Sequence, residues 1–107
     1  SGNTKNIRYH EISKFPLVQR DLSFVANKYV TFEDIDRLLE SLSIKQLKNY
    51  RLFDIFKSEK LGNNKQSMAM NFTFLDETKT MKDDEVDKIM AKITRGIEEN
   101  LKAEIRK

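Results

Sequence analysis

The stretch that decides the fold is Ser67-Met68-Ala69-Met70-Asn71-Phe72-Thr73-Phe74, in which large apolar side chains occupy every second position. Successive side chains of a β-strand point to opposite faces of a sheet, so this alternation predicts a half-buried strand and not a helix. The methionines and phenylalanines are expected in a core. The small and polar set is expected on a sheet face that nothing large covers, which makes that face a candidate binding surface.

The rest of the chain predicts three more strands and two amphipathic helices. The strands are expected at residues 20–26, 47–58 and 101–106, and the helices at 31–43 and 83–100. A turn at residues 61–64 makes a hairpin of the second and third strands, with Lys57, Lys60 and Lys65 around its tip. The order predicts an α+β fold of the ferredoxin-like βαββαβ type, a four-stranded antiparallel sheet with two helices on one face. A continued helix is the alternative for the final strand.

Three details of these elements are open to test. Thr31 is the expected N-cap of the first helix, and Thr80 is a chemically better cap for the second than Lys82. In the 47–58 strand we expect Phe53 and Ile55 to be buried, because the opposite register would bury Asp54 without a partner. The other face would then carry Tyr50, Leu52, Asp54 and Phe56.

Length and composition indicate one globular domain with a modest core. The 107 residues include 20 Lys and Arg and 17 Asp and Glu, so the net charge of +3 permits contact with a nucleic acid but would not by itself hold one. No signal peptide or membrane-spanning run is visible, and the lack of cysteine is compatible with the cytoplasm. The chain starts with Ser1-Gly2-Asn3, like a cloning remnant. We therefore expect a tag and interdomain remnant at residues 1–13 and the domain at 14–107.

The sequence offers no catalytic or metal-binding constellation. Its single histidine, His10, lies in the leader without an associated nucleophile, and its three glycines form no phosphate-binding loop. The acidic run Asp83-Asp84-Glu85 suits a helix N-terminus better than a divalent ion. We therefore expect no catalytic residue, metal or cofactor in this domain.

The uncovered sheet face is the better candidate for a site. A solvated sheet surface is the default interpretation, and single-stranded RNA is the sharper one. Phe56 could stack on a base, Ala69 would let a base lie close, and hydroxyl, amide and carboxylate groups could contact base edges. The residues expected on this face are Asp21, Ser23, Asp54, Phe56, Ser67, Ala69 and Asn71.

Several stretches in order and spacing resemble the ferredoxin-fold anticodon-binding domain, which closes the β subunit of bacterial phenylalanyl-tRNA synthetase. The departures are Phe56 where tyrosine is usual, Asn71 where arginine or lysine is common, and Lys82 in place of a Thr or Ser cap. The matching stretches are Phe15-Pro16-Leu17-Val18-Gln19-Arg20-Asp21-Leu22-Ser23-Phe24, Leu52-Phe53-Asp54-Ile55-Phe56, Lys65-Gln66-Ser67-Met68-Ala69, Phe72-Thr73-Phe74, Asp76 through Val86, and Ala103-Glu104-Ile105-Arg106.

The resemblance implies a non-catalytic module of an ATP-dependent phenylalanine–tRNA ligase. The module would hold the anticodon of tRNA(Phe) on its open sheet face, and aminoacylation with ATP and Mg²⁺ would occur elsewhere in an (αβ)₂ parent. Its partners would be the tRNA, the rest of the β subunit and the α subunit, with no membrane, and the isolated domain would be a monomer. The first and third strands would lie at the centre of the sheet. The RNA-binding residues it implies are Arg20, Asp21, Ser23, Asp54, Phe56, Ser67, Ala69, Asn71 and Arg106.

Two other classes of function compete with RNA binding. A ferredoxin-like regulatory or self-association domain without RNA binding is the main alternative. An acylphosphatase-like enzyme would need an arginine in a phosphate-cradling loop after the first strand, and Asn27-Lys28-Tyr29 supplies no such loop.

Overall fold

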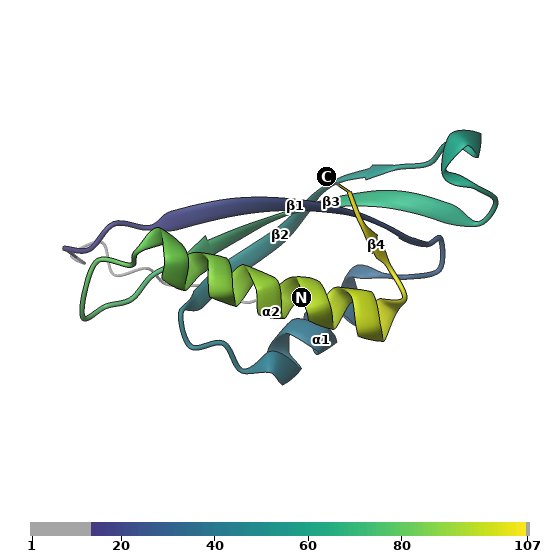
Figure 1. Ribbon diagram of the computed structural model, residues 1–107. Helices are drawn as coiled ribbons and strands as arrows, with labels where there is room; N and C mark the ends of the chain where they lie inside the picture. The colour runs from purple at the N-terminus through teal and green to yellow at the C-terminus, as the bar shows by residue number, and fades with distance from the viewer. Residues whose placement is uncertain (1–13, 107) are drawn as a thin grey trace.

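The computed structural model describes residues 14–106, and their element order is the predicted βαββαβ (Figure 1). A short 3-10 turn at Glu59–Leu61 lies inside the predicted hairpin. The leader, including His10, lies outside the described residues. The elements are β1 (Val18–Asn27), α1 (Phe32–Leu42), β2 (Leu47–Phe56), η1 (Glu59–Leu61), β3 (Lys65–Phe74), α2 (Asp83–Leu101) and β4 (Glu104–Ile105).

The four strands form one antiparallel sheet in the order β2-β3-β1-β4, so β1 and β3 are central as predicted. Both helices cover the same face of the sheet, and the opposite face is left bare by the described chain (Figure 1). This arrangement confirms the ferredoxin-like fold.

The core lies between the sheet and the two helices. On β3, Met68, Met70, Phe72 and Phe74 are each at most 1% exposed, as the alternation predicts. The opposing helix residues include Ile35 and Leu39 of α1 and Val86, Ile93 and Ile97 of α2. Gly96 brings the backbone of α2 close to α1, because a β-carbon there would lie 3.4 Å from Leu38 Cδ1. The glycine therefore has a packing role that offsets its low helix propensity.

The expected register of β2 is wrong in part. Tyr50 and Leu52 lie opposite Phe72 and Met70, on the helix side of the sheet. The register then shifts by one residue at Phe53, so Asp54 and Phe56 do lie on the bare face, as predicted, while Ile55 lies opposite Met68. Instead of being buried, Phe53 is 46% and Ile55 49% exposed.

Tyr50 explains why the first half of β2 faces the helices. Its hydroxyl donates to the carboxylate of Asp36, and Glu40 Oε2 lies within hydrogen-bond distance of the same oxygen at 3.1 Å, so both carboxylates of α1 share the one phenolic proton. Partial burial, followed by these two carboxylate contacts, raises the pKa of Tyr50 well above its ordinary value. The phenol therefore stays protonated and links β2 to α1.

The two helices begin in different ways. Thr31 caps α1 as predicted: Thr31 Oγ1 accepts from Asp34 N at 3.2 Å, and Asp34 Oδ2 accepts from Thr31 N at 2.9 Å. The hydrogen bond from the Thr31 backbone N–H, together with the Thr31 side chain and the Arg37 guanidinium, holds the pKa of the Asp34 carboxyl below its usual value. The predicted Thr80 cap of α2 is wrong. Lys82 is the N-cap, and its backbone N–H is satisfied by Glu85 Oε1 at 2.9 Å.

The end of the chain forms the short final strand and not a longer helix. Lys102 takes a left-handed conformation with φ of 54°, which ends α2. Ile105 then lies opposite Phe24, and Ala103 is buried. None of the helices within residues 14–106 has the length and apolar character needed to cross a bilayer.

The cap assignment gives a testable pair of variants. Thr31→Ala should lower the free energy of unfolding by about 1 kcal/mol, because it leaves the Asp34 N–H without its side-chain acceptor. Thr80→Ala should change it by less than about 0.5 kcal/mol, since Thr80 is exposed and caps nothing. Urea denaturation followed by circular dichroism measures both. Equal losses for the two variants would contradict the assignment.

Candidate nucleic-acid interface

The bare side of the sheet, called the open face below, carries side chains from all four strands. Antiparallel pairing puts directly opposite residues on the same face, so the register assigns each residue to a side. The open face consists of Gln19, Asp21, Ser23, Val25 and Asn27 of β1, Asn49, Arg51, Asp54 and Phe56 of β2, Lys65, Ser67, Ala69, Asn71 and Thr73 of β3, and Glu104 and Arg106 at the chain's end.

A charged row crosses the open face from β2 to β1. Arg51, Asn71 and Asp21 lie opposite one another in that order. Asn71 Nδ2 donates to Asp21 Oδ1 at 2.8 Å, and the Arg51 guanidinium lies 5.5 Å from the centre of the Phe53 ring. The hydrogen bond fixes the orientation of the Asp21 carboxylate and leaves its other oxygen as an acceptor.

In the next row, a small side chain lies between two polar side chains. Ala69 lies between Asp54 on β2 and Ser23 on β1. Cross-strand neighbours are about 5 Å apart, so a flat ring resting on Ala69 would have a carboxylate at one side and a hydroxyl at the other. This row combines close approach with groups that can hydrogen-bond to a base edge.

The third row contains Phe56, Ser67 and Val25, with Arg106 reaching over it. Arg106 N donates to Ser23 O at 2.9 Å, and Arg106 Nη1 donates to Ser67 Oγ at 3.3 Å. Ser67 is consequently only 8% exposed, whereas Phe56 beside it is 54% exposed. The expectation that the whole outer set of β3 is uncovered is therefore wrong for Ser67, and also for Thr73, which is 6% exposed.

All but one of the residues expected to bind RNA meet on the open face. Arg20 is the exception: it lies opposite Phe72, on the helix side, and its Nη2 is 3.4 Å from Asp83 Oδ1 at the start of α2. The structure thus separates Arg20 from the other candidates and gives it a contact between β1 and α2.

Sequence reasoning missed Arg51 as a member of the open face, and it missed the exposed Phe53 ring that the Arg51 guanidinium contacts. A strict period of two along β2 puts Tyr50, Leu52 and Asp54 on one face, which mixes apolar and charged residues. This mixture was the signal in the sequence for a β-bulge. One extra residue in β2 puts the apolar side chains on the helix side and the polar side chains on the open face. With the insertion at Phe53, Arg51 joins the open face opposite Asn71.

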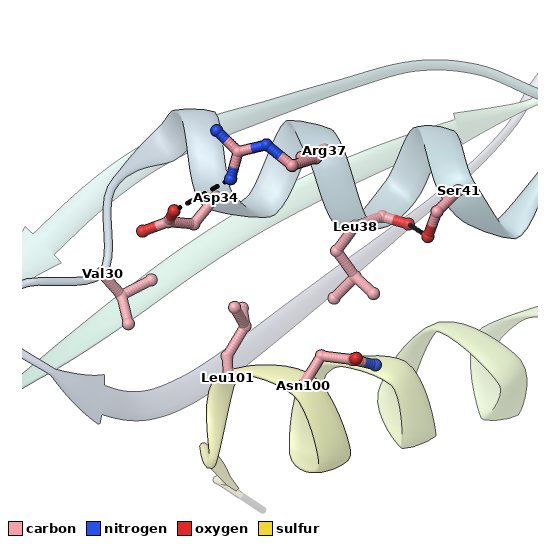
Figure 2. A pocket seen from close by; sticks show the side chains of 7 residues that line it. All are labelled: Val30, Asp34, Arg37, Leu38, Ser41, Asn100 and Leu101. Atoms are coloured by element: carbon pink, nitrogen blue, oxygen red, sulfur yellow. Dashed lines mark hydrogen bonds and ion pairs between the residues drawn. The ribbon is translucent and has the colours of Figure 1, made fainter.

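The helix side offers less chemistry. A shallow pocket lies there between α1 and the end of α2 (Figure 2), but its polar groups bond within the chain. Arg37 pairs with Asp34 at 3.2 Å, Ser41 Oγ donates to Leu38 O at 2.6 Å, and Asn100 donates to Gly96 O. Among residues 14–106, no group of three or more His, Cys, Asp or Glu side chains is arranged to hold a metal.

Known proteins match nearly all of the chain. The family model described as "Ferredoxin-fold anticodon binding domain" matches residues 13–106. The phenylalanine–tRNA ligase beta subunit of Bacteroides thetaiotaomicron is 40% identical over 100 residues, which is 94% of this chain and 12% of that protein. The beta subunit of Streptococcus mutans is 38% identical over 98 residues, which is 92% of this chain and 12% of the relative. The chain thus spans about an eighth of the length of these curated relatives.

The contrast between two phenylalanines tests the division between core and open face. Phe72→Ala should lower the free energy of unfolding by about 3–5 kcal/mol, because Phe72 is fully buried. Phe56→Ala should cost less than about 1 kcal/mol, because more than half of this residue is exposed. Urea denaturation of both variants provides the measurement. A large loss for Phe56→Ala would mean that its ring supports the fold.

Proposed function

Because the chain belongs to the ferredoxin-fold anticodon-binding domain family, we propose that its open face binds the anticodon of tRNA(Phe) as part of a phenylalanine–tRNA ligase beta subunit. The observation that carries the proposal is the row of Asp54, Ala69 and Ser23 across the three main strands of the open face. A flat base could pack against Ala69 in this row, with the polar groups of Asp54 and Ser23 at the edges of the base.

The chemistry of the open face fits unpaired bases. Phe56 presents an exposed ring for stacking, and the Arg51 guanidinium with the Phe53 ring offers a second planar surface. Asp21 and Asp54 accept hydrogen bonds only, so they favour base edges with amino or imino groups and disfavour edges with carbonyl groups alone. The face therefore provides both general attraction to bases and discrimination between them.

The proposal gives this chain a binding role within a larger enzyme. Residues 14–107 form the binding domain in this proposal. Aminoacylation with ATP and Mg²⁺ occurs in other parts of the cytoplasmic enzyme, which pairs this beta subunit with an alpha subunit in an (αβ)₂ assembly. The isolated domain is a monomer in this proposal.

A titration with an anticodon stem-loop tests the binding face. With ¹⁵N-labelled protein, a tRNA(Phe) stem-loop should shift the amide signals of Ser23, Asp54 and Ala69, and a stem-loop with an altered anticodon should bind at least about tenfold more weakly, as expected for the loss of one good base contact. Shifts confined to α1 and α2 would contradict the proposal. Light scattering on the same sample should give a monomer. A dimer that does not bind the stem-loop would favour the self-association alternative.

A steric block provides an independent test. Ala69→Tyr should reduce stem-loop affinity by at least about tenfold, since the new ring would occupy the place of a base whose stacking contributes about 1–3 kcal/mol. Ala91→Tyr is the matched control, because Ala91 is exposed on α2 and far from the open face. Fluorescence anisotropy measures affinity, and circular dichroism verifies folding. Equal affinities for the two variants would argue against an RNA-binding open face.

A further inference from the structure

One end of the sheet carries four lysines that the proposed anticodon contacts do not use. Lys57, Lys60 and Lys65 belong to the β2–β3 hairpin, and Lys28 belongs to the turn between β1 and α1. We call these four residues the basic lip. None of them takes part in an ion pair within residues 14–106, and Glu59 is the single carboxylate among residues 57–66.

Hydrogen bonds to the backbone hold the lip in place. Lys28 N donates to Asn64 O at 2.8 Å, which joins the β1–α1 turn to the hairpin. Within the hairpin, Ser58 Oγ accepts from Lys60 N at 3.1 Å, and Gly62 turns the chain with φ of 105°. The buried Gln66 donates from Nε2 to the carbonyl oxygens of Asn27 and Val30. The lysine side chains therefore project from an ordered backbone.

The lip continues the open face. Lys65 lies on that face opposite Asn27, two residues before Ser67, and Lys57 is the first residue of the hairpin loop after β2. In Figure 1, η1 lies on the side of the sheet away from the helices, so the hairpin bends toward the open face. Tyr29 is 73% exposed beside Lys28, whose Nζ lies 5.1 Å from the centre of its ring. Basic groups thus alternate with exposed aromatic rings at this end.

The charges along the sheet are polarised. At the end opposite the lip, the approach to α2 and its first turn carry Asp76, Glu77, Asp83, Asp84 and Glu85. Three of these acids are paired within the chain: Glu77 with Lys48, Asp83 with Arg20 and Glu85 with Lys79. These three basic groups are therefore already engaged by carboxylates. A polyanion lying across the open face is therefore attracted more strongly to the lip, whose lysines form no ion pair among residues 14–106, than to the other end.

We infer that the basic lip binds phosphate groups of the RNA strand whose bases lie on the open face. This inference rests on the proposed function and adds the direction in which the strand leaves the sheet. Lysine contacts phosphate as a mobile point charge, which suits a sequence-independent contact beside a face that reads bases. The lip thus supplies affinity that depends on salt, whereas the rows of the open face supply selectivity.

The test is a salt titration of stem-loop binding by two charge-matched triple variants of the 107-residue chain. The lip variant is K57Q/K60Q/K65Q, and the control, K88Q/K92Q/R95Q, removes the same charge from exposed positions of α2. Fluorescence anisotropy with the cognate stem-loop at several salt concentrations gives the slope of log Kd against log salt. The lip variant should lower the slope by about two to three units and weaken binding by about tenfold or more near 0.1 M salt, whereas the control should stay close to the wild type.

The altered-anticodon stem-loop separates the two proposals. If the lip variant keeps the wild-type ratio of cognate to altered affinity while its slope falls, both proposals are supported. If discrimination is retained and the lip variant behaves like the α2 control, the phosphate contact is overturned and the anticodon proposal stands. If wild type binds both stem-loops equally but the lip variant loses slope, the phosphate contact stands and anticodon reading is overturned. Absence of wild-type binding overturns both.

Discussion

The burial of one side of β3 is the constraint on which the rest of this structure depends. β3 pairs with β1 on one edge and with β2 on the other, and Met68, Met70, Phe72 and Phe74 all point into the core. Right-handed crossovers bring α1 and α2 to that same side. The described chain then has no element left to cover the other side. The open face is therefore a consequence of how the core is built, before any functional residue is considered.

The pairing register determines which open-face residues can act together. Side chains alternate with a period of two, so a slip of one residue would move every candidate to the helix side. In β2 the chain meets two demands at once: Tyr50 must reach the carboxylates of α1, and Asp54 must stay in solvent. The extra residue at Phe53 satisfies both, and it also brings Arg51 into line with Asn71 and Asp21.

The sequence predicted those features of the fold that depend on interactions between residues close together in the chain. The alternation in β3, the apolar stripes of the two helices and the Thr31 cap were all readable, because each depends on neighbours in sequence. The exceptions depend on distant partners. Arg20 pairs with Asp83, which is 63 residues away, and Ser67 is covered by Arg106 from the end of the chain. The cap of α2 depends on Glu85 reaching back to a backbone N–H, which removes the need for a hydroxyl at Lys82 or Thr80.

The proposed RNA contacts would separate base selectivity from electrostatic attraction along the sheet. The centre of the open face carries two carboxylates, Asp21 and Asp54, which in the proposed complex would discriminate between base edges but repel phosphates. A net charge of +3 spread evenly over the chain would not overcome that repulsion. The lysines of the lip, which form no ion pair among residues 14–106, would offset that repulsion, because an RNA strand could keep its phosphates over the lip while its bases lie over the carboxylates. A higher salt concentration would then lower the affinity of the domain for RNA without changing its preference among bases.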